Sequence, residues 1–395
     1  MRPVSDVERR SRLARRHGLA SGERYADALA ATRAMTVLHA TEAATVHLSL
    51  WARVDRLAVD DVERALYDDR SLVKQLAMRR TLFVFPRDLL PAAWASASAR
   101  VAAQQRAQLG KRVVGAGIAA DADAWIARAF DDVLDLLGDG VPRTTAQVRE
   151  LVPELEGRFT LGDPSKKWGG DFPIGRWVVG TLAAEGRLVR ATNAGHWRRN
   201  LPTWTTTDAW LGDVPEPWSA EAGYAELVRR WLFTFGPGTE ADIVWWLGST
   251  KTAVRKALAE VGAVEVALEG DATGWVLPDD VDPVAPVEPW GALLPTLDPT
   301  VMGWRGRSFY LDASHAPYLF DTNGNAGHTA WWDGRIVGCW VQDPAGVVVP
   351  VLREDVGSEG RAALDAEAAR LTDWLDGVRI TNVYASPQMK GAALP

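Results

Sequence analysis

The amino-acid sequence predicts a mixed α+β protein made of three tandem winged helix-turn-helix units and a β-rich C-terminal domain. The prediction depends on a helix–helix–helix–hairpin pattern that recurs along the chain and on a change of character near residue 286. A chain of 395 residues is too long for one ordinary core, so several domains are expected. Its 47% apolar and 24% charged residues are typical of a soluble globular protein.

The clearest unit covers residues 223–280. The segment YAELVRRWLFTFG has apolar residues at helical spacing, which predicts an amphipathic helix. Thr239 with Asp242 three residues later is a capping-box pattern for a short second helix, which Gly248 ends. STKTAVRKALAEVG predicts a third helix that stops at Gly262, and VEVALEGDATGWVLP predicts a hairpin around a Gly/Asp turn. Three helices and a hairpin in this order indicate a winged helix-turn-helix.

Two looser copies of this pattern precede it. In residues 123–213, helices are predicted for ADAWIARAFDDVLDLLGDG, TTAQVRELVPEL and PIGRWVVGTLAAEG. The alternating segment RLVRATNAGHWRRNLPTWTTTD then predicts a wing with its tip near Asn193–Gly195. In residues 25–90, YADALAATRAMTVLH and AVDDVERALYD predict helices, and LVKQLAMRRTLFVFP predicts strands.

The C-terminal part is richer in predicted strands. TAWWDGRIVGCWVQ predicts a hairpin with Asp333–Gly334 as a type I′ turn. VVVPVLRED adds a strand, SEGRAALDAEAARLTDWLDG a helix and VRITNVYA a last strand. The predicted boundaries are 1–115 for the first unit with its N-terminal helix, 116–215 for the second, 216–283 for the third and 284–395 for the C-terminal domain.

Several classes of function are excluded by what the sequence contains. The single cysteine, Cys339, excludes an internal disulfide and a cysteine-built zinc site. The six histidines are scattered, and the glycine loops, HExxH pair and nucleophile elbow of common enzymes are absent. DTNGNAGHTAWW begins like a calcium loop, but Ala326 and Trp332 stand where glycine and glutamate are required. We therefore expect no metal and no cofactor.

The termini and hydropathy of the chain favour the cytoplasm. No apolar run reaches the roughly 20 residues that a membrane span needs. The N-terminal MRPVSDVERRSRLARRHGLA lacks the apolar region of a secretory signal. A cytoplasmic protein without a membrane partner is expected.

Charge is distributed unevenly along the chain. The net charge is −7, but residues 1–112 hold 20 Lys and Arg against 12 Asp and Glu, net +8, and residues 113–395 hold 24 against 39, net −15. A second basic cluster runs over residues 166–199. This asymmetry indicates an anionic partner, although solvated helix faces are the alternative for each cluster. The residues expected to contact DNA phosphates are Lys74, Arg79, Arg80, Lys166, Lys167, Arg198 and Arg199.

The stretch LHATEAATVHLSLWARV places polar residues at the start of an apolar helix. Thr41 is a suitable N-cap, which would leave Glu42 in the first turn against the helix dipole and His39 in a preceding loop. His47 is expected to pack in the core. The stretch is therefore either a capped core helix or a small catalytic group.

Four segments resemble the bacterial AlkZ-like family: LHAT…LSLWARV, MRRTLFVFPRDLL, LLPTLDPTVMGW and LFDTNGNAG…WWDGRIVGCW. The similarity spans roughly residues 27–383. Members are winged-helix DNA glycosylases that remove alkylated bases and unhook interstrand crosslinks. The resemblance implies three winged-helix units and a C-terminal β-barrel-like domain, curved around duplex DNA. The family's catalytic signature is glutamine, an apolar residue, then glutamine or aspartate; by position it falls on His39, Ala40 and Thr41, so this chain differs at both polar places.

The chemistry that the resemblance implies defines roles for these side chains. Glycosidic cleavage passes through an oxocarbenium-like sugar, so an enzyme must hold a water molecule beside it. His39, with an ordinary pKa of about 6.5, is the expected general base. Thr41 is expected to hold the water or a sugar oxygen. Glu42 is the rival base, or a carboxylate that stabilises the developing cation.

Three functions remain open from the sequence. The first is a monomeric, cofactor-free DNA glycosylase that acts on alkylated or bulky-adduct purines in double-stranded DNA. The second is a non-catalytic winged-helix DNA-binding protein, such as a regulator or a lesion sensor, which the loss of both signature residues favours. The third is a scaffold that binds no DNA, which the net acidity favours.

Overall fold

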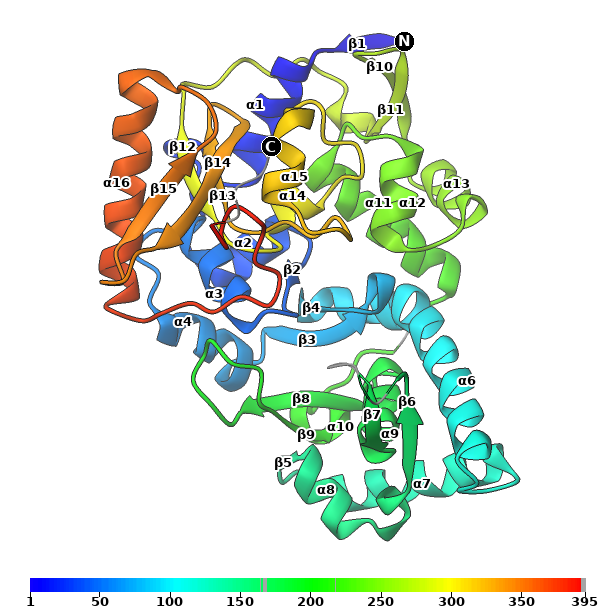
Figure 1. Ribbon diagram of the computed structural model, residues 1–395. Helices are drawn as coiled ribbons and strands as arrows, with labels where there is room; N and C mark the ends of the chain where they lie inside the picture. Colours follow the sequence, from blue (N-terminus) through cyan, green and yellow to red (C-terminus); the bar gives the residue numbers. More distant parts are fainter. Residues whose placement is uncertain (164, 166–168, 217, 392–395) are drawn as a thin grey trace.

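The computed structural model describes residues 1–163, 165, 169–216 and 218–391 (Figure 1). The strands of these residues form several small sheets, with helices packed around them. The mixed α+β class that the sequence predicts is confirmed. Within the same residues, no helix is long and apolar enough to cross a membrane.

The first region contains a three-stranded antiparallel sheet with β4 at its centre. His39 of β2 and Gln75 of β3 both pair with Phe83 of β4. His39 therefore lies in a strand, because the backbone of β2 completes this sheet. The alternative that placed His39 in a loop was wrong, and the helix predicted through YADALAATRAMTVLH ends at Ala34. The elements are α1 (Asp6–Arg16), α2 (Ala28–Ala34), β2 (Leu38–His39), α3 (Ala43–Trp51), α4 (Val59–Glu63), β3 (Leu72–Ala77) and β4 (Thr81–Pro86), followed by α5 (Leu90–Ala93).

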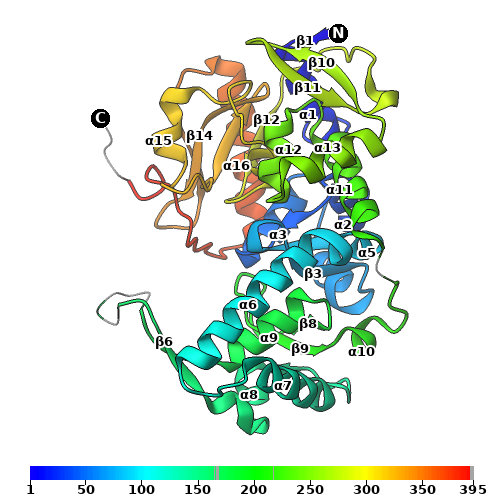
Figure 2. The same cartoon turned by 90° about the vertical axis from the view of Figure 1, so that its right-hand side faces the viewer.

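The second region has an apolar core of its own. Helix α6 (Ala99–Gly115) leads into it from the first region (Figure 2). Its core includes Ile126, Phe130, Val178 and Trp204. The predicted helices are present and are followed by an antiparallel hairpin of β8 and β9, and a hairpin of β6 and β7, which the sequence did not predict, projects beside them (Figure 2). The elements are α7 (Ala122–Leu137), β5 (Arg143–Thr144), α8 (Thr145–Leu151), β6 (Arg158–Leu161), β7 (Gly170–Pro173), α9 (Gly175–Ala184), β8 (Leu188–Asn193), β9 (Pro202–Thr206) and α10 (Thr207–Leu211).

The third region has the predicted order of three helices and a hairpin. Thr239 and Asp242 form the expected capping box, and Gly248 ends α12 with a left-handed φ of 61°. The N-terminal strand β1 (Arg2–Val4) adds to this hairpin by pairing in parallel with β10. The elements are α11 (Ala220–Phe235), α12 (Glu240–Leu247), α13 (Lys251–Glu260), β10 (Val264–Leu268) and β11 (Ala272–Val276).

The C-terminal region is an open antiparallel sheet in the order β12-β13-β14-β15. In the described chain the outer strands do not pair with each other, so no closed barrel forms; instead α16 packs on the sheet. Asp333 and Gly334 have φ values of 46° and 76°, which confirms the predicted type I′ turn. The elements are β12 (Gly291–Leu294), α14 (Pro299–Met302), α15 (Ala316–Leu319), β13 (Thr329–Trp332), β14 (Arg335–Gln342), β15 (Val348–Leu352) and α16 (Gly357–Leu375).

The segment after α16 is not the strand that VRITNVYA predicted. Residues 378–391 contain no strand, and several of their backbone groups bond to side chains of other elements. The amide of Ile380 donates to Oε1 of Gln342, and Nε2 of Gln342 donates to the carbonyl of Val378. We call residues 378–391 the C-terminal strap; in Figure 1 it runs back from α16 past β2.

The hydrophobic cores divide the chain into two main parts. One large cluster joins side chains of the first, third and C-terminal regions, for example Leu48, Trp231 and Trp331. Most buried apolar side chains of the second region form the other cluster, although Val189, Ala191, Trp210 and Leu211 of that region belong to the large one. The four predicted domains correspond to the four successive groups of helices and strands described above. We keep their boundaries as a proposal.

Candidate nucleic-acid interface and catalytic loop

His39 lies at the end of β2 and is only 4% exposed. Its ring lies against Phe83, with centroids 4.6 Å apart. Burial, together with the nearby guanidinium of Arg79, lowers the pKa of His39 to about 3. Neither ring nitrogen has a hydrogen-bond partner within the part of the chain that the structure describes. His39 is therefore a neutral imidazole with unused hydrogen-bonding capacity.

Thr41 and Glu42 follow directly, and the expected cap at Thr41 was wrong. Helix α3 begins at Ala43 with Glu42 at the N-cap position, and no side chain caps it. Glu42 does not act as a cap because its Oε1 accepts the backbone N–H groups of Val383 at 2.6 Å and Tyr384 at 3.1 Å. Burial raises the pKa of Glu42, while these two backbone bonds act to lower it. Thr41 itself stays partly exposed.

An amide from the second region holds the backbone of the same loop. Nδ2 of Asn200 donates to the carbonyl oxygen of Thr41 at 2.8 Å and lies 3.3 Å from that of Ala40. The guanidinium of Arg198 donates to the carbonyl of Arg379 in the strap. The loop between β8 and β9 and the strap therefore meet at residues 40–42. The sequence did not indicate Asn200, because no local pattern announces a contact across 159 residues.

Helix α3 is fixed to the C-terminal region by a buried ion pair. Arg53 donates two hydrogen bonds, of 2.9 and 2.7 Å, to the two carboxylate oxygens of Asp298, and both side chains are 0% exposed. The hydroxyl of Ser49 and the backbone N–H of Thr300 also donate to this carboxylate. Two of the segments that carried the family resemblance, LSLWARV and LLPTLDPTVMGW, thus bind each other.

His47, the other histidine of the stretch, packs in the core as expected. It is 2% exposed, and its Nε2 lies 3.0 Å from Oε1 of Glu63. Its ring is 4.9 Å from that of Trp197 in the loop between β8 and β9. His47 therefore helps to join the first region to the second.

Two of the expected phosphate contacts are largely enclosed. Nζ of Lys74 donates to the hydroxyl of Tyr67 at 2.9 Å, and burial with the nearby Arg190 lowers the pKa of Lys74 to about 8. The guanidinium of Arg79 lies 3.9 Å from the centroid of the Trp245 ring, and burial lowers the pKa of Arg79 to about 10. Arg79 thus joins the first region to the third, whereas Lys74 is bound to Tyr67 within the first region.

The other expected contacts differ in their exposure. Arg80, at the tip of the β3–β4 hairpin, and Arg199, in the loop between β8 and β9, are exposed. Arg198 is half-buried by its bond to the strap. Lys166 and Lys167 lie outside the described residues. Among the predicted contacts that the structure describes, Arg80 and Arg199 are therefore the exposed ones.

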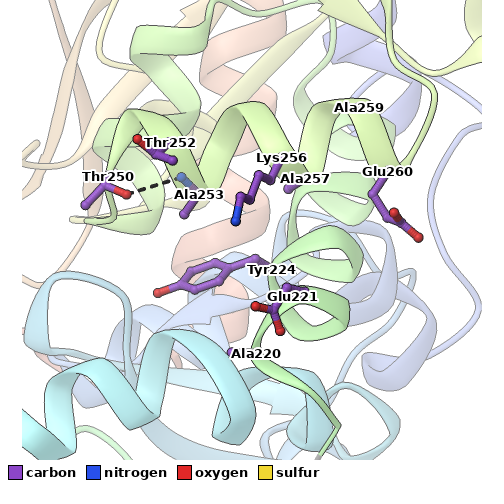
Figure 3. Close-up of a pocket in the computed structure, with 10 residues that line it drawn as sticks. All are labelled: Ala220, Glu221, Tyr224, Thr250, Thr252, Ala253, Lys256, Ala257, Ala259 and Glu260. Atoms are coloured by element: carbon purple, nitrogen blue, oxygen red, sulfur yellow. Dashed lines mark hydrogen bonds between the residues drawn. The ribbon is translucent and has the colours of Figure 1, made fainter.

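A pocket of about 610 Å³ lies elsewhere, between α11 and α13 (Figure 3). Tyr224 and Lys256 extend into it from the two helices. None of the predicted site residues lines it. Among the described residues, no group of three or more His, Cys, Asp or Glu side chains is placed to hold a metal ion.

Comparison with known protein families defines the class of protein. Residues 32–374 match the family DNA glycosylase AlkZ-like, and the chain belongs to this family. Its members are DNA glycosylases. The prediction from the sequence that the protein is such an enzyme is confirmed.

A solved structure supports the same fold. The DNA glycosylase AlkZ of Streptomyces sahachiroi matches with a TM-score of 0.73 and 20% sequence identity, over 94% of this chain and 98% of that one. No curated protein matches the chain.

Proposed function

We propose that this member of the family hydrolyses the N-glycosidic bond of alkylated or bulky-adduct purines in duplex DNA, with a water molecule positioned by His39 and Thr41. The observation that carries the proposal is the state of His39: a neutral imidazole with two unpaired nitrogens, at the position where the resemblance places a catalytic amide. A buried polar group without a partner costs about 1–3 kcal/mol. A water molecule bonded to His39 would remove that cost.

The low pKa of His39 changes the role that the sequence suggested. A base with a pKa of about 3 is poorly matched to proton abstraction near neutral pH. A neutral imidazole can still accept a hydrogen bond and orient water, as an amide does. It also adds no positive charge beside an oxocarbenium-like sugar or a cationic purine. Because such a purine is a good leaving group, orientation of the water would be sufficient.

Thr41 would complete the site from the solvent side. It is partly exposed, whereas His39 is nearly buried. The ladder of the sheet continues past His39, because the N–H of Ala40 donates to the carbonyl of Leu82 at 2.9 Å. Side chains two residues apart in an extended segment point to the same side. This spacing supports a shared water between the imidazole and the threonine hydroxyl.

The proposed partner is double-stranded DNA, bound by a monomer. Three helices followed by a hairpin in residues 220–276 support the winged helix-turn-helix interpretation. Arg80 and Arg199 would contact phosphates, with the half-buried Arg198 holding the loop from which Arg199 projects. Binding should weaken steeply with salt if phosphates supply the affinity.

Base release from duplex DNA that contains N7-alkylated guanine tests the proposal. His39→Ala should lower the single-turnover rate by about 100-fold, the loss expected when a reacting water molecule is no longer held in position. His39→Gln should restore much of the rate, because an amide oxygen can also accept from water. His315→Gln is a matched control, since His315 is also buried, at 7% exposure, with an unpaired ring nitrogen. Equal rates for wild type and a folded His39→Ala would refute the role of His39.

The variant Glu42→Gln distinguishes a structural role of Glu42, in which it binds the strap, from a role as the general base. The glutamine oxygen can still accept the amides of Val383 and Tyr384, so a purely structural residue should retain the rate within about threefold, a difference of well under 1 kcal/mol. A loss of about 100-fold with unchanged DNA affinity would identify Glu42 as the base. Thermal unfolding of the variant shows whether the strap remains in place.

A second candidate function is a non-catalytic lesion sensor or regulator. The change of both signature residues to His39 and Thr41 favours it. Tight, salt-dependent binding to alkylated duplex without release of base, in wild type and His39→Gln alike, would select this function.

A further inference from the structure

Two exposed apolar side chains belong to segments that contact residues 39–42, the candidate catalytic loop. Val383 is 82% exposed and Leu201 is 50% exposed. Isolated apolar residues are common on protein surfaces, so exposure alone is not informative. These two are distinguished by their position. The amide of Val383 bonds to Glu42, and Leu201 directly follows Asn200, which bonds to Thr41.

Both residues are held on ordered backbone. Besides its bond to Glu42, the strap is fixed by Asn382, whose Nδ2 lies 3.0 Å from Nε2 of His328. Leu201 is bonded in both directions: its N–H donates to Oδ1 of Asn193 at 2.8 Å, and its carbonyl accepts the N–H of Ala194 at 2.8 Å. The backbone that carries these side chains is therefore already ordered, and little conformational entropy of the backbone is lost when they contact a partner.

The residues around Leu201 and Val383 include arginines, which suits contact with the phosphates of a nucleic acid. Arg199 is exposed two residues before Leu201, and Arg379 is exposed four residues before Val383. Arg198 connects the two segments through the carbonyl of Arg379. Apolar side chains with arginines beside them are the combination that DNA-binding proteins insert into a base step while they neutralise the neighbouring phosphates.

We propose that Leu201 and Val383 form a two-sided apolar wedge, which enters duplex DNA next to the nucleotide that faces Thr41. The proposal rests on the proposed function, because it takes residues 39–42 as the point of contact with DNA. The wedge separates one base step and holds the sugar against the loop. Unstacking is cheapest where a base is damaged or missing, so the wedge selects damaged steps without a deep pocket for the base.

Duplexes with a tetrahydrofuran abasic site next to 2-aminopurine test the wedge directly. Wild-type protein should bind this duplex about tenfold more tightly than the intact duplex, the effect of burying roughly one aliphatic side chain. It should also raise the 2-aminopurine fluorescence, which increases when the base is unstacked. The double variant Leu201→Ala/Val383→Ala should lose both effects and keep the salt dependence of binding to intact duplex.

Leu151→Ala/Val114→Ala is the matched control. These residues are a leucine and a valine with 56% and 53% exposure, on α8 and α6 of the lower part of the molecule in Figure 1. Truncation at exposed positions has little effect on folding. The control should behave as wild type.

The outcomes separate the wedge from the glycosylase proposal. Loss of preference and fluorescence only in Leu201→Ala/Val383→Ala supports the wedge, even if no base is released from alkylated DNA. Normal preference and fluorescence in that variant overturn the wedge, even if the enzyme is active. Absence of any DNA binding by the wild type overturns both.

Discussion

The buried pair of Arg53 and Asp298 provides a quantitative test of how helix α3, which follows the loop at residues 39–42, is held in place. Asp298 accepts four hydrogen bonds, two from Arg53 and one each from Ser49 and Thr300, at 2.7–2.9 Å. Asp298→Asn replaces one acceptor oxygen with an N–H group. Each carboxylate oxygen accepts from the guanidinium, so the new N–H group must face an N–H group of Arg53 in either orientation. The charge of Arg53 then remains buried without a counter-charge.

We expect Asp298→Asn to lower the free energy of unfolding by about 3–5 kcal/mol, the usual result of removing one partner from a buried ion pair. Urea titration followed by tryptophan fluorescence and by circular dichroism measures this change. Asp88→Asn is the control. Asp88 pairs with Arg33 where the two side chains are 43% and 49% exposed, and loss of such a pair should cost less than about 1 kcal/mol.

A second substitution checks the physical reason. Arg53→Met in the Asp298→Asn background removes the uncompensated charge, so the double variant should be more stable than Asp298→Asn alone. A loss below about 1 kcal/mol for Asp298→Asn would refute the reasoning. A double variant less stable than the single one would show that packing of the arginine stem, and not its charge, supports α3.

Further predictions concern pH and one glycine. Because the pKa of His39 is about 3, base release should be constant between about pH 5 and 7, whereas a base with the ordinary histidine pKa of about 6.5 would lose activity in that window. The free energy of unfolding, by contrast, should fall as the pH is lowered. Burial lowers the pKa of His328 to about 3, so the unfolded chain binds a proton at this histidine at a higher pH than the folded chain does. His328 alone should lower stability by about 2 kcal/mol between about pH 7 and 5, and urea titrations of His328→Gln should lack this part of the pH dependence. Gly248→Ala should destabilise more than Gly262→Ala in thermal unfolding. Their φ values are 61° and 64°, but an added Cβ would lie 2.9 Å from Cγ of Arg79 at the first position and 3.6 Å from Pro278 at the second; equal losses would exclude the steric cause.

The elements that could be predicted from the sequence are those whose determinants are local. Asp333–Gly334 makes a type I′ turn because both residues tolerate a positive φ. Thr239 and Asp242 cap α12 because they are three residues apart. The failures share a different cause. Thr41 does not cap α3, since the preceding strand fixes the loop and Glu42 binds the strap instead.

The residues around the site could not be predicted in the same way. VRITNVYA has the alternation of a strand, but its amides bond to the side chains of Gln342 and Glu42 rather than to another strand. Asn200 holds the loop at residues 39–42 through a contact that spans 159 residues. Periodicity reports which face of an element is buried. It contains no information on which distant side chain will meet that element.

The protonation state of His39 depends on contacts of this kind. Residue type alone gives an imidazole with a pKa of about 6.5, which suits a general base. The folded chain buries that imidazole against Phe83 and beside Arg79. Arg79 is itself held by the ring of Trp245 and by the close approach of Gly248, both in the third region. A substitution in the third region can therefore alter the electrostatics of a loop in the first, because the arginine that this region holds adds to burial, the larger cause of the low pKa of His39.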